Sequence, residues 1–235
     1  MLIVSTAIDF NADQVRPFMT SLLDTGYDGD IIFLVNECPA KYYLKSMNVE
    51  VVDNQSQGYP LNSDRFFMYK EFVRGVDDSL IVDSRDLVFQ SDPSLHMPLK
   101  GIHAFEEDRS QTLGTCPYNN LWLTQMLGTN PYPEKPILCA GTICGQLSEY
   151  IIDLWEHIKS TNPLIGFDQG IHNHLCYSGK YDVTIHENGM PVYTVGYTHS
   201  DNIDLVEGII YKDGDLPCII HQYDRHPKLK GLKWL

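Results

Sequence analysis

The sequence predicts an α/β fold built on a mostly parallel sheet, and three observations support this prediction. Short apolar segments alternate with helical segments along the first hundred residues, which is typical of strands joined by crossover helices. The segment 31–35 (IIFLV) is apolar throughout, as expected for a strand buried on both faces of a sheet. Polar residues directly follow three of the apolar segments, where sheets of this class bind their ligands.

The first half of the chain carries clear signals for the ends of its elements. Asn11 and Gln14 form a capping box for a helix that Gly26 ends. Ser63 is expected to cap a helix over 64–74, with Phe67, Phe72 and Val73 on its apolar side. A further short helix is expected at 39–46. Four strands are expected, at 2–7, 31–35, 49–52 and 80–82.

The second half is less regular than the first. We expect strands at 101–105 and 136–145, helices at 118–127 and 146–160, and another helix starting near Asp168. Beyond residue 180 only short strand-like pieces alternate with Gly, Asp and Pro. No repeat, low-complexity tract or linker interrupts the sequence, so we expect one domain over residues 1–235.

The composition excludes several classes of protein. A net charge of −14 argues against a general nucleic-acid or anionic-membrane binder, because no basic face offsets it. No apolar run approaches the ~20 residues of a membrane span, so none is expected. The six cysteines form no CxxC pair and indicate reduced thiols. Residues 1–7 look like a strand and not a signal peptide, and a cytoplasmic location is the default expectation.

Familiar nucleotide and hydrolase signatures are missing from the sequence. No GxGxxG follows the first strand, and neither GxxxxGK[ST] nor GxSxG occurs, which disfavours a dinucleotide fold, a P-loop and a nucleophile elbow. The triplet Asp24-Thr25-Gly26 is similar to that of aspartic proteases. It closes a helix and has no second copy, so we discount it.

Two carboxylates stand directly after a short buried strand in the segment 79–93 (SLIVDSRDLVFQSDP). Asp83 and Asp86 follow the strand, with Arg85 between them. Asp and Ser residues at such a place are typical of an ordinary turn. Carboxylate oxygens on a rigid support are equally typical of a divalent-cation site, and a neutral imidazole would add a ligand that suits Mn²⁺. The residues alone leave both interpretations open.

This strand with its acid pair and the following QSDP resembles the DxD region of GT-A glycosyltransferases, particularly glycosyltransferase family 8 and glycogenin. Five further segments resemble that family in the same order: VSTAIDF (4–10), NSDRFFMYKEF (62–72), LCAGTICG (138–145), FDQG (167–170) and IIHQYDRHPKLKGLKW (219–234). The resemblance implies a GT-A fold, with a mostly parallel central sheet and helices on both faces. It also implies a nucleotide-binding half over about 1–100 and an acceptor-side half over about 101–235.

The resemblance assigns roles to individual residues. Mn²⁺ or Mg²⁺ would be held by Asp83, Asp86 and His221. The nucleotide-sugar donor would be bound by Thr6, Ala7, Asp9, Arg65, Asp83, Ser84, Arg85, Gly141 and Lys228, with Arg65 and Lys228 beside the diphosphate. By the resemblance, catalytic roles would fall on Asp168 and Gln169. Asp108 is a further catalytic candidate because of its place on the rim of the site, and Asp168 or Asp108 could serve as a general base.

The implied function is a metal-dependent glycosyltransferase that moves a sugar from a UDP- or GDP-sugar to a glycan or another hydroxyl acceptor. This sequence departs from the family in its Asp83-x-x-Asp86 spacing, in Cys139-Ala140-Gly141 where the family has Asn-Ser-Gly, and around Lys228, where Arg225 and Lys230 are rivals. A metal-dependent nucleotidyltransferase or phosphohydrolase and a non-catalytic nucleotide-sugar binder stay open. The stereochemistry stays open as well.

Several residues also have purely structural interpretations. We expect Trp122 and Trp155 in the core, and His172 and His174 at ordinary surface or packing positions. His226 is expected to be solvated, and 106–108 to form an exposed charge run that lies on the rim of the site.

Overall fold

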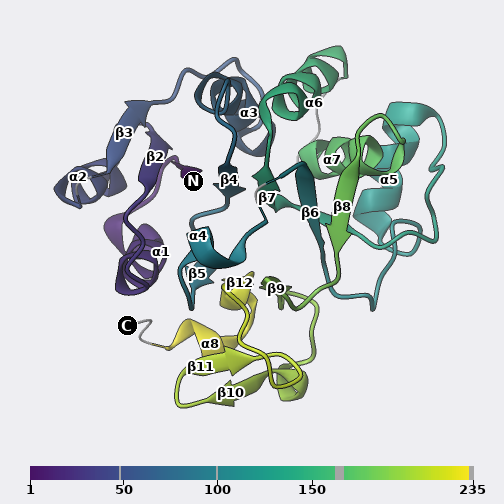
Figure 1. The fold of residues 1–235 in the computed structure, drawn as a ribbon. Helices are drawn as coiled ribbons and strands as arrows, with labels where there is room; N and C mark the ends of the chain where they lie inside the picture. Colours follow the sequence, from purple (N-terminus) through teal and green to yellow (C-terminus); the bar gives the residue numbers. More distant parts are fainter. Residues whose placement is uncertain (48, 99, 162–166, 233–235) are drawn as a thin grey trace.

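A seven-stranded sheet forms the centre of the computed structural model, which describes residues 1–47, 49–98, 100–161 and 167–232 (Figure 1). Its strand order is β3-β2-β1-β4-β7-β6-β8. The strands are β1 (Leu2–Ala7), β2 (Asp30–Val35), β3 (Glu50–Asp53), β4 (Ser79–Val82), β6 (Ile102–Glu106), β7 (Leu138–Gly145) and β8 (Val183–His186). Only β7 runs antiparallel to its neighbours β4 and β6, so the prediction of a mostly parallel sheet is confirmed.

Helices cover both faces of this sheet, as predicted. The helices of the structure are α1 (Ala12–Asp24), α2 (Pro39–Ser46), α3 (Leu61–Phe72), α4 (Pro93–His96), α5 (Pro117–Leu127), α6 (Ser148–Ser160), α7 (Phe167–Tyr177) and α8 (Pro227–Lys230). Of these, α1 and α2 pack on one face of the sheet and α3, α6 and α7 on the other. Side chains alternate along each strand, so Ile3 packs with α1 and α2 in one buried cluster, whereas Val4 packs with α3, α6 and α7 in another. Burial on both faces explains why the central strands read as continuous apolar runs.

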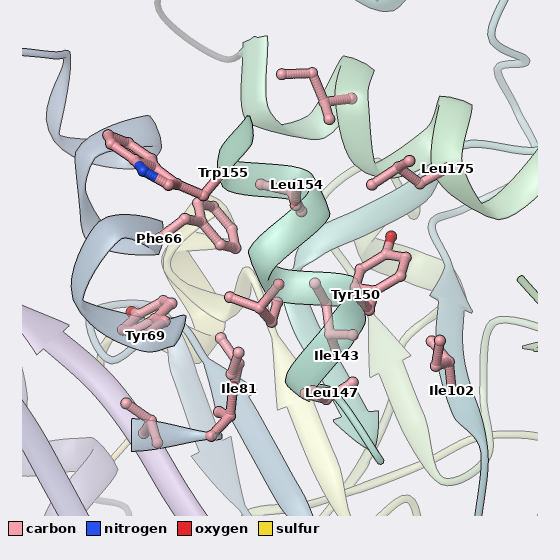
Figure 2. Close-up of a cluster of buried hydrophobic side chains, with 14 of the residues drawn as sticks. Phe66, Tyr69, Ile81, Ile102, Ile143, Leu147, Tyr150, Leu154, Trp155 and Leu175 are labelled. Atoms are coloured by element: carbon pink, nitrogen blue, oxygen red, sulfur yellow. The ribbon is translucent and has the colours of Figure 1, made fainter. Parts of the chain in front are cut away.

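The cluster beneath α3 and α6 is dense in large side chains (Figure 2). Phe66 and Tyr69 project from α3 toward Tyr150 and Leu154 of α6, above Ile81 and other sheet residues. Trp155 is 3% exposed in this cluster, so its predicted core position is confirmed. Trp122 is only partly buried, but it packs against the same cluster.

The start of α1 agrees with the start predicted from the sequence, and the start of α3 does not. The capping box of Asn11 and Gln14 is present, and α1 ends at Asp24, just before Gly26. The prediction that Ser63 caps α3 is wrong, because the helix begins at Leu61, three residues earlier than predicted, and Pro60 stands at its cap position. The amides of Ser63 and Asp64 donate to the carbonyl of Pro60 at 2.9 and 2.8 Å. Phe66 and Tyr69 of this helix are fully buried, whereas Phe67 and Phe72, predicted for its apolar side, are only partly buried.

A second, three-stranded sheet brings distant parts of the chain together. It contains β5 (Leu87–Phe89), β12 (Ile219–His221) and β9 (Val192–Thr194) in the order β5-β12-β9. A hairpin of β10 (Asp204–Val206) and β11 (Ile209–Tyr211) lies beside it, below the central sheet in Figure 1. Leu87 pairs with His221 across β5 and β12, so the segment after the acid pair lies beside the late histidine.

His172 and His174 both belong to α7. His172 is fully buried and packs against α6, whereas His174 is partly buried. The Nδ1 atom of His172 is 2.6 Å from the hydroxyl of Tyr150. Burial lowers the pKa of His172 to about 3. The folded protein therefore keeps this imidazole neutral at a pH where the unfolded chain protonates it.

We expect this histidine to make the fold acid-sensitive. Below the unfolded pKa of about 6.5, and down to the folded pKa, the unfolded chain binds a proton that the folded protein does not. This effect lowers the free energy of unfolding by about 1.4 kcal/mol per pH unit. Urea denaturation at pH 7, 6 and 5 should show a shallower pH profile for His172→Gln than for the wild type. A His199→Gln control should follow the wild type, because the His199 side chain is 73% exposed. Parallel profiles for all three proteins would contradict this assignment.

The six cysteines are buried and form no disulfide, in agreement with the prediction of reduced thiols. Within the described ranges, no helix has the length and apolar character needed to cross a membrane.

Candidate active site

Asp83 lies where the buried strand β4 ends, and a neighbouring strand and a helix hold it there. Its backbone amide donates to the carbonyl of Gly141 in β7 at 2.9 Å. Its carboxylate forms an ion pair with Arg65 of α3, and Arg65 also lies 3.3 Å from the carboxylate of Asp168. Burial opposes ionisation of Asp83, but Arg65 and His221 hold the pKa of this carboxyl well below its usual range. Asp83 is therefore an anion throughout the physiological pH range.

Asp83, Asp86 and His221 form a three-residue cluster that we call the acid–histidine cluster. One ligand atom from each residue lies within 4.8 Å of the other two. The Nε2 atom of His221 is 3.7 Å from Oδ2 of Asp83 and 3.6 Å from Oδ1 of Asp86. The β5–β12 pairing explains this convergence, since it places His221 beside the residue that follows Asp86.

One buried nitrogen of this cluster has no partner among the described residues, and a bound cation would be such a partner. His221 is 1% exposed, and its Nε2 has no hydrogen-bond partner among the residues that the structure describes. Such an atom is costly to bury unless something binds it. Burial disfavours the imidazolium, but nearby Cys139, Asp86 and Asp83 raise the pKa of His221 overall. A proton and a cation would thus compete for the same nitrogen, and two carboxylates with one imidazole suit Mn²⁺.

Gly141 makes room for this cluster. A Cβ atom at this position would collide with the Asp83 carboxylate and would lie 2.7 Å from Cε1 of His221. Any larger residue would therefore push two members of the cluster apart.

A cleft of about 460 Å³ opens in front of the cluster. Six residues predicted to bind donor or metal line it: Thr6, Arg65, Asp83, Ser84, Arg85 and Asp86. The hydroxyl of Ser84 donates to the carbonyl of Thr6 at 2.7 Å, which ties the ends of β4 and β1 together. Four other residues predicted to bind the donor do not line the cleft: Ala7, Asp9, Gly141 and Lys228. Ala7 is fully buried, and Asp9 is exposed and accepts from Asn36 at 2.7 Å.

Asp168 and Gln169 lie in the first turn of α7, on the side of the site where Arg65 lies. Asp168 accepts a hydrogen bond from the Asn62 amide at 2.8 Å and lies beside Arg65. Burial raises the pKa of Asp168, although Arg65 opposes that shift. Gln169 donates to Asn119 at 3.4 Å. The charged guanidinium of Arg65 thus links two of the predicted site residues, Asp168 and Asp83.

Asp108 and Lys228 lie apart from the acid–histidine cluster. Asp108 lines a separate hollow of about 270 Å³ and accepts from the Thr198 hydroxyl at 2.9 Å. The Lys228 ammonium donates to the carbonyls of Ser200 and Ile203, the latter at 3.4 Å. Of the rivals considered for Lys228, Arg225 lines the cleft.

Two structural expectations near the site are wrong. Residues 106–108 are not an exposed charge run, because Glu106 and Glu107 are 4% and 3% exposed. Glu106 accepts two hydrogen bonds from Arg109, at 2.6 and 2.9 Å. His226 is not solvated: it is 5% exposed, and its Nε2 lies 2.7 Å from the carbonyl of Val195.

Sequence reasoning gave no role to Asp224 or Phe10, and it placed Glu107 on the rim of the site only as part of an exposed charge run. Asp224 and Phe10 line the cleft, and Glu107 lies behind it, close to His221 and Cys139. Burial raises the pKa of Glu107, although His221 and Arg225 oppose that shift. A usable signal existed for Glu107, since it directly follows a strand parallel to β4 and so belongs to the same sheet edge. No comparable pattern marks Asp224.

Comparison with known structures identifies this arrangement of strands. The galactosyltransferase LgtC, solved with donor and acceptor sugar analogues, aligns with a TM-score of 0.58 and 18% identity over 94% of this chain and 86% of its own. The fold is GT-A. The glycosyltransferase GlyE of Streptococcus pneumoniae TIGR4 also aligns with a TM-score of 0.58 and 18% identity over 94% of this chain. The alignment spans about half of GlyE, or 54% of its chain.

The GT-A fold was predicted from the sequence, and the structure confirms that prediction. No protein-family model matches the chain, and no curated protein matches it. The similarity to LgtC and GlyE therefore lies in the arrangement of strands and helices. The chemistry of the site has to be argued from this chain's own residues.

Proposed function

We propose that this protein transfers a sugar from a UDP- or GDP-sugar to a hydroxyl group of a glycan or another acceptor, with Mn²⁺ or Mg²⁺ as cofactor. The observation that carries this proposal is the acid–histidine cluster with its unpartnered buried nitrogen, placed in a cleft of a GT-A fold. The description of LgtC as a galactosyltransferase with donor and acceptor sugar analogues supports the class of reaction.

Asp83, Asp86 and His221 would hold the metal ion. Their two carboxylates and one imidazole leave coordination positions for other oxygen atoms, such as those of a diphosphate. When bound, the ion supplies Lewis-acid stabilisation of the negative charge that develops on the diphosphate leaving group.

The remaining residues would position the donor. Thr6 and Ala7 end β1 and Asp9 follows it, on the side expected for the nucleoside, with Ser84 and Arg85 on the adjacent segment. Gly141 would let the transferred sugar approach the sheet. Arg65 keeps Asp83 ionised and orients Asp168, which with Gln169 would face the sugar. Asp108, in the neighbouring hollow, would meet an acceptor and not the donor.

Calorimetry with UDP- and GDP-sugars, with and without Mn²⁺, tests this function. We expect at least one donor to bind only when Mn²⁺ is present, because the chain's charge of −14 opposes a free diphosphate. No binding in any combination would end the proposal. Product analysis separates the rival enzymes, since a phosphohydrolase or nucleotidyltransferase releases phosphate or pyrophosphate where a glycosyltransferase releases a nucleoside diphosphate. Binding without turnover of any donor would indicate a non-catalytic binder.

A further inference from the structure

We propose that Arg225 binds the diphosphate of the donor, and that Gly196 and Tyr197 hold its guanidinium group at the cleft. This inference rests on the proposed function for the name of the ligand. Its chemistry is more general, since it requires only two linked phosphates beside a divalent cation.

Arg225 is an exposed cation at the mouth of the cleft, and its charge acts on the buried carboxyl of Glu107. It lines the cleft together with Asp83 and Asp86, and it is exposed. It forms no ion pair with any residue that the structure describes. Arg65, by contrast, is buried between two carboxylates and has its charge already matched. Arg225 is therefore available to a ligand in a way that Arg65 is not.

The segment after β9 forms a seat for this side chain. The Arg225 guanidinium lies over the ring of Tyr197, with Cζ 5.5 Å from the ring centroid. A Cβ atom at position 196 would lie 2.7 Å from Nη1 and 3.0 Å from Cδ of Arg225. Glycine at 196 thus permits the backbone to pass directly beneath the arginine, and the tyrosine ring fixes its direction.

Backbone contacts fix this seat relative to the acid–histidine cluster. The amide of Gln222 donates to the carbonyl of Asp86 at 2.7 Å, and the amide of Val195 donates to the carbonyl of His221 at 3.0 Å. His226, the residue after Arg225, lies 2.7 Å from the carbonyl of Val195. The chain around Arg225 is therefore held by backbone hydrogen bonds to the segments that carry Asp86 and His221, and these bonds fix its position.

Lys228 is the cation that the family resemblance pointed to, and its geometry argues against it. Its ammonium is engaged by the carbonyls of Ser200 and Ile203, and it does not line the cleft. A guanidinium also offers a planar fork that binds two phosphate oxygens at once, which an ammonium does not. The structure thus assigns the diphosphate contact to Arg225, three residues earlier in the chain.

The test measures binding of UDP, GDP and inorganic pyrophosphate by calorimetry at saturating Mn²⁺. We expect Arg225→Ala to weaken binding of every probe by at least about tenfold, as loss of a charge-assisted hydrogen bond does. Affinity for Mn²⁺ alone should stay within about twofold of wild type. Arg225→Lys should give an intermediate loss, because it keeps the charge without the fork. The matched control Lys228→Ala should bind all probes like the wild type.

Variants of Tyr197 test whether its ring positions the Arg225 guanidinium. Tyr197→Ala should weaken pyrophosphate binding by about three- to tenfold without changing Mn²⁺ affinity, whereas Tyr197→Phe keeps the ring and should bind normally. Thermal unfolding midpoints check that each variant folds. The inference would be overturned if Arg225→Ala bound the probes with the affinity of the wild type, or if only Lys228→Ala lost affinity for them. A wild type that binds no pyrophosphate would also overturn it. If pyrophosphate binds through Arg225 but neither UDP nor GDP binds, the inference stands and the proposed function fails.

Discussion

Replacing Asp83 with asparagine should lower turnover of the nucleotide sugar by about 10²- to 10³-fold, because it removes an anionic ligand from the proposed metal site. The carboxylate lies at the centre of the site, paired with Arg65 and close to His221. Asparagine has nearly the same size, so packing is preserved while the charge is lost. Turnover at saturating donor, measured across a Mn²⁺ titration, checks this expectation.

A matched control comes from another strand end of the same sheet. Asp53 closes β3 and forms an exposed ion pair with Lys41 at 2.6 Å, and it does not line the cleft. Asp53→Asn should therefore keep wild-type turnover. Because Arg65 would still be paired with Asp168, Asp83→Asn should fold, which its thermal midpoint can confirm. Unchanged Mn²⁺-dependent turnover in Asp83→Asn would remove the main support for the proposed function.

Replacing Gly141 with alanine should damage both stability and metal binding. The added methyl group would meet the Asp83 carboxylate and the His221 ring, and such overpacking costs about 1–3 kcal/mol. The same displacement should separate the ligands of the acid–histidine cluster. Urea denaturation and Mn²⁺ calorimetry measure the two effects on the same sample.

The control for this substitution is a glycine with free space around it. At Gly231 the nearest atom to an added Cβ is the carbonyl oxygen of Pro227 at 4.0 Å, so Gly231→Ala should leave both quantities unchanged. If Gly141→Ala binds Mn²⁺ and unfolds like the wild type, the cluster is not as tightly enclosed as its geometry indicates.

Local sequence patterns predicted the elements of this fold well. The apolar runs marked the strands, and Asn11 marked a helix start, because each signal depends on residues close together in the chain. Strand direction was not predictable in this way. Nothing in the sequence of β7 shows that it runs against β4 and β6, since an apolar strand reads the same in either direction. That reversal is what places Gly141 opposite Asp83.

The candidate site was predictable only in part, for a related reason. The acids after β4 follow from the rule for strand ends, and the family resemblance added His221. The directions of Lys228 and His226 depend on carbonyl groups about thirty residues away, at Ser200 and Val195. The family resemblance therefore pointed to the lysine, while the contacts of the folded chain favour Arg225.

The pairing of β5 with β12 has a consequence for how the site comes into being. Two of its proposed ligands precede β5, but the third lies on β12, far later in the chain. During synthesis, the early segments alone would offer a cation only carboxylates. Tight capture of Mn²⁺ would therefore await docking of the late strand, and the bound ion would then stabilise that docked state against release.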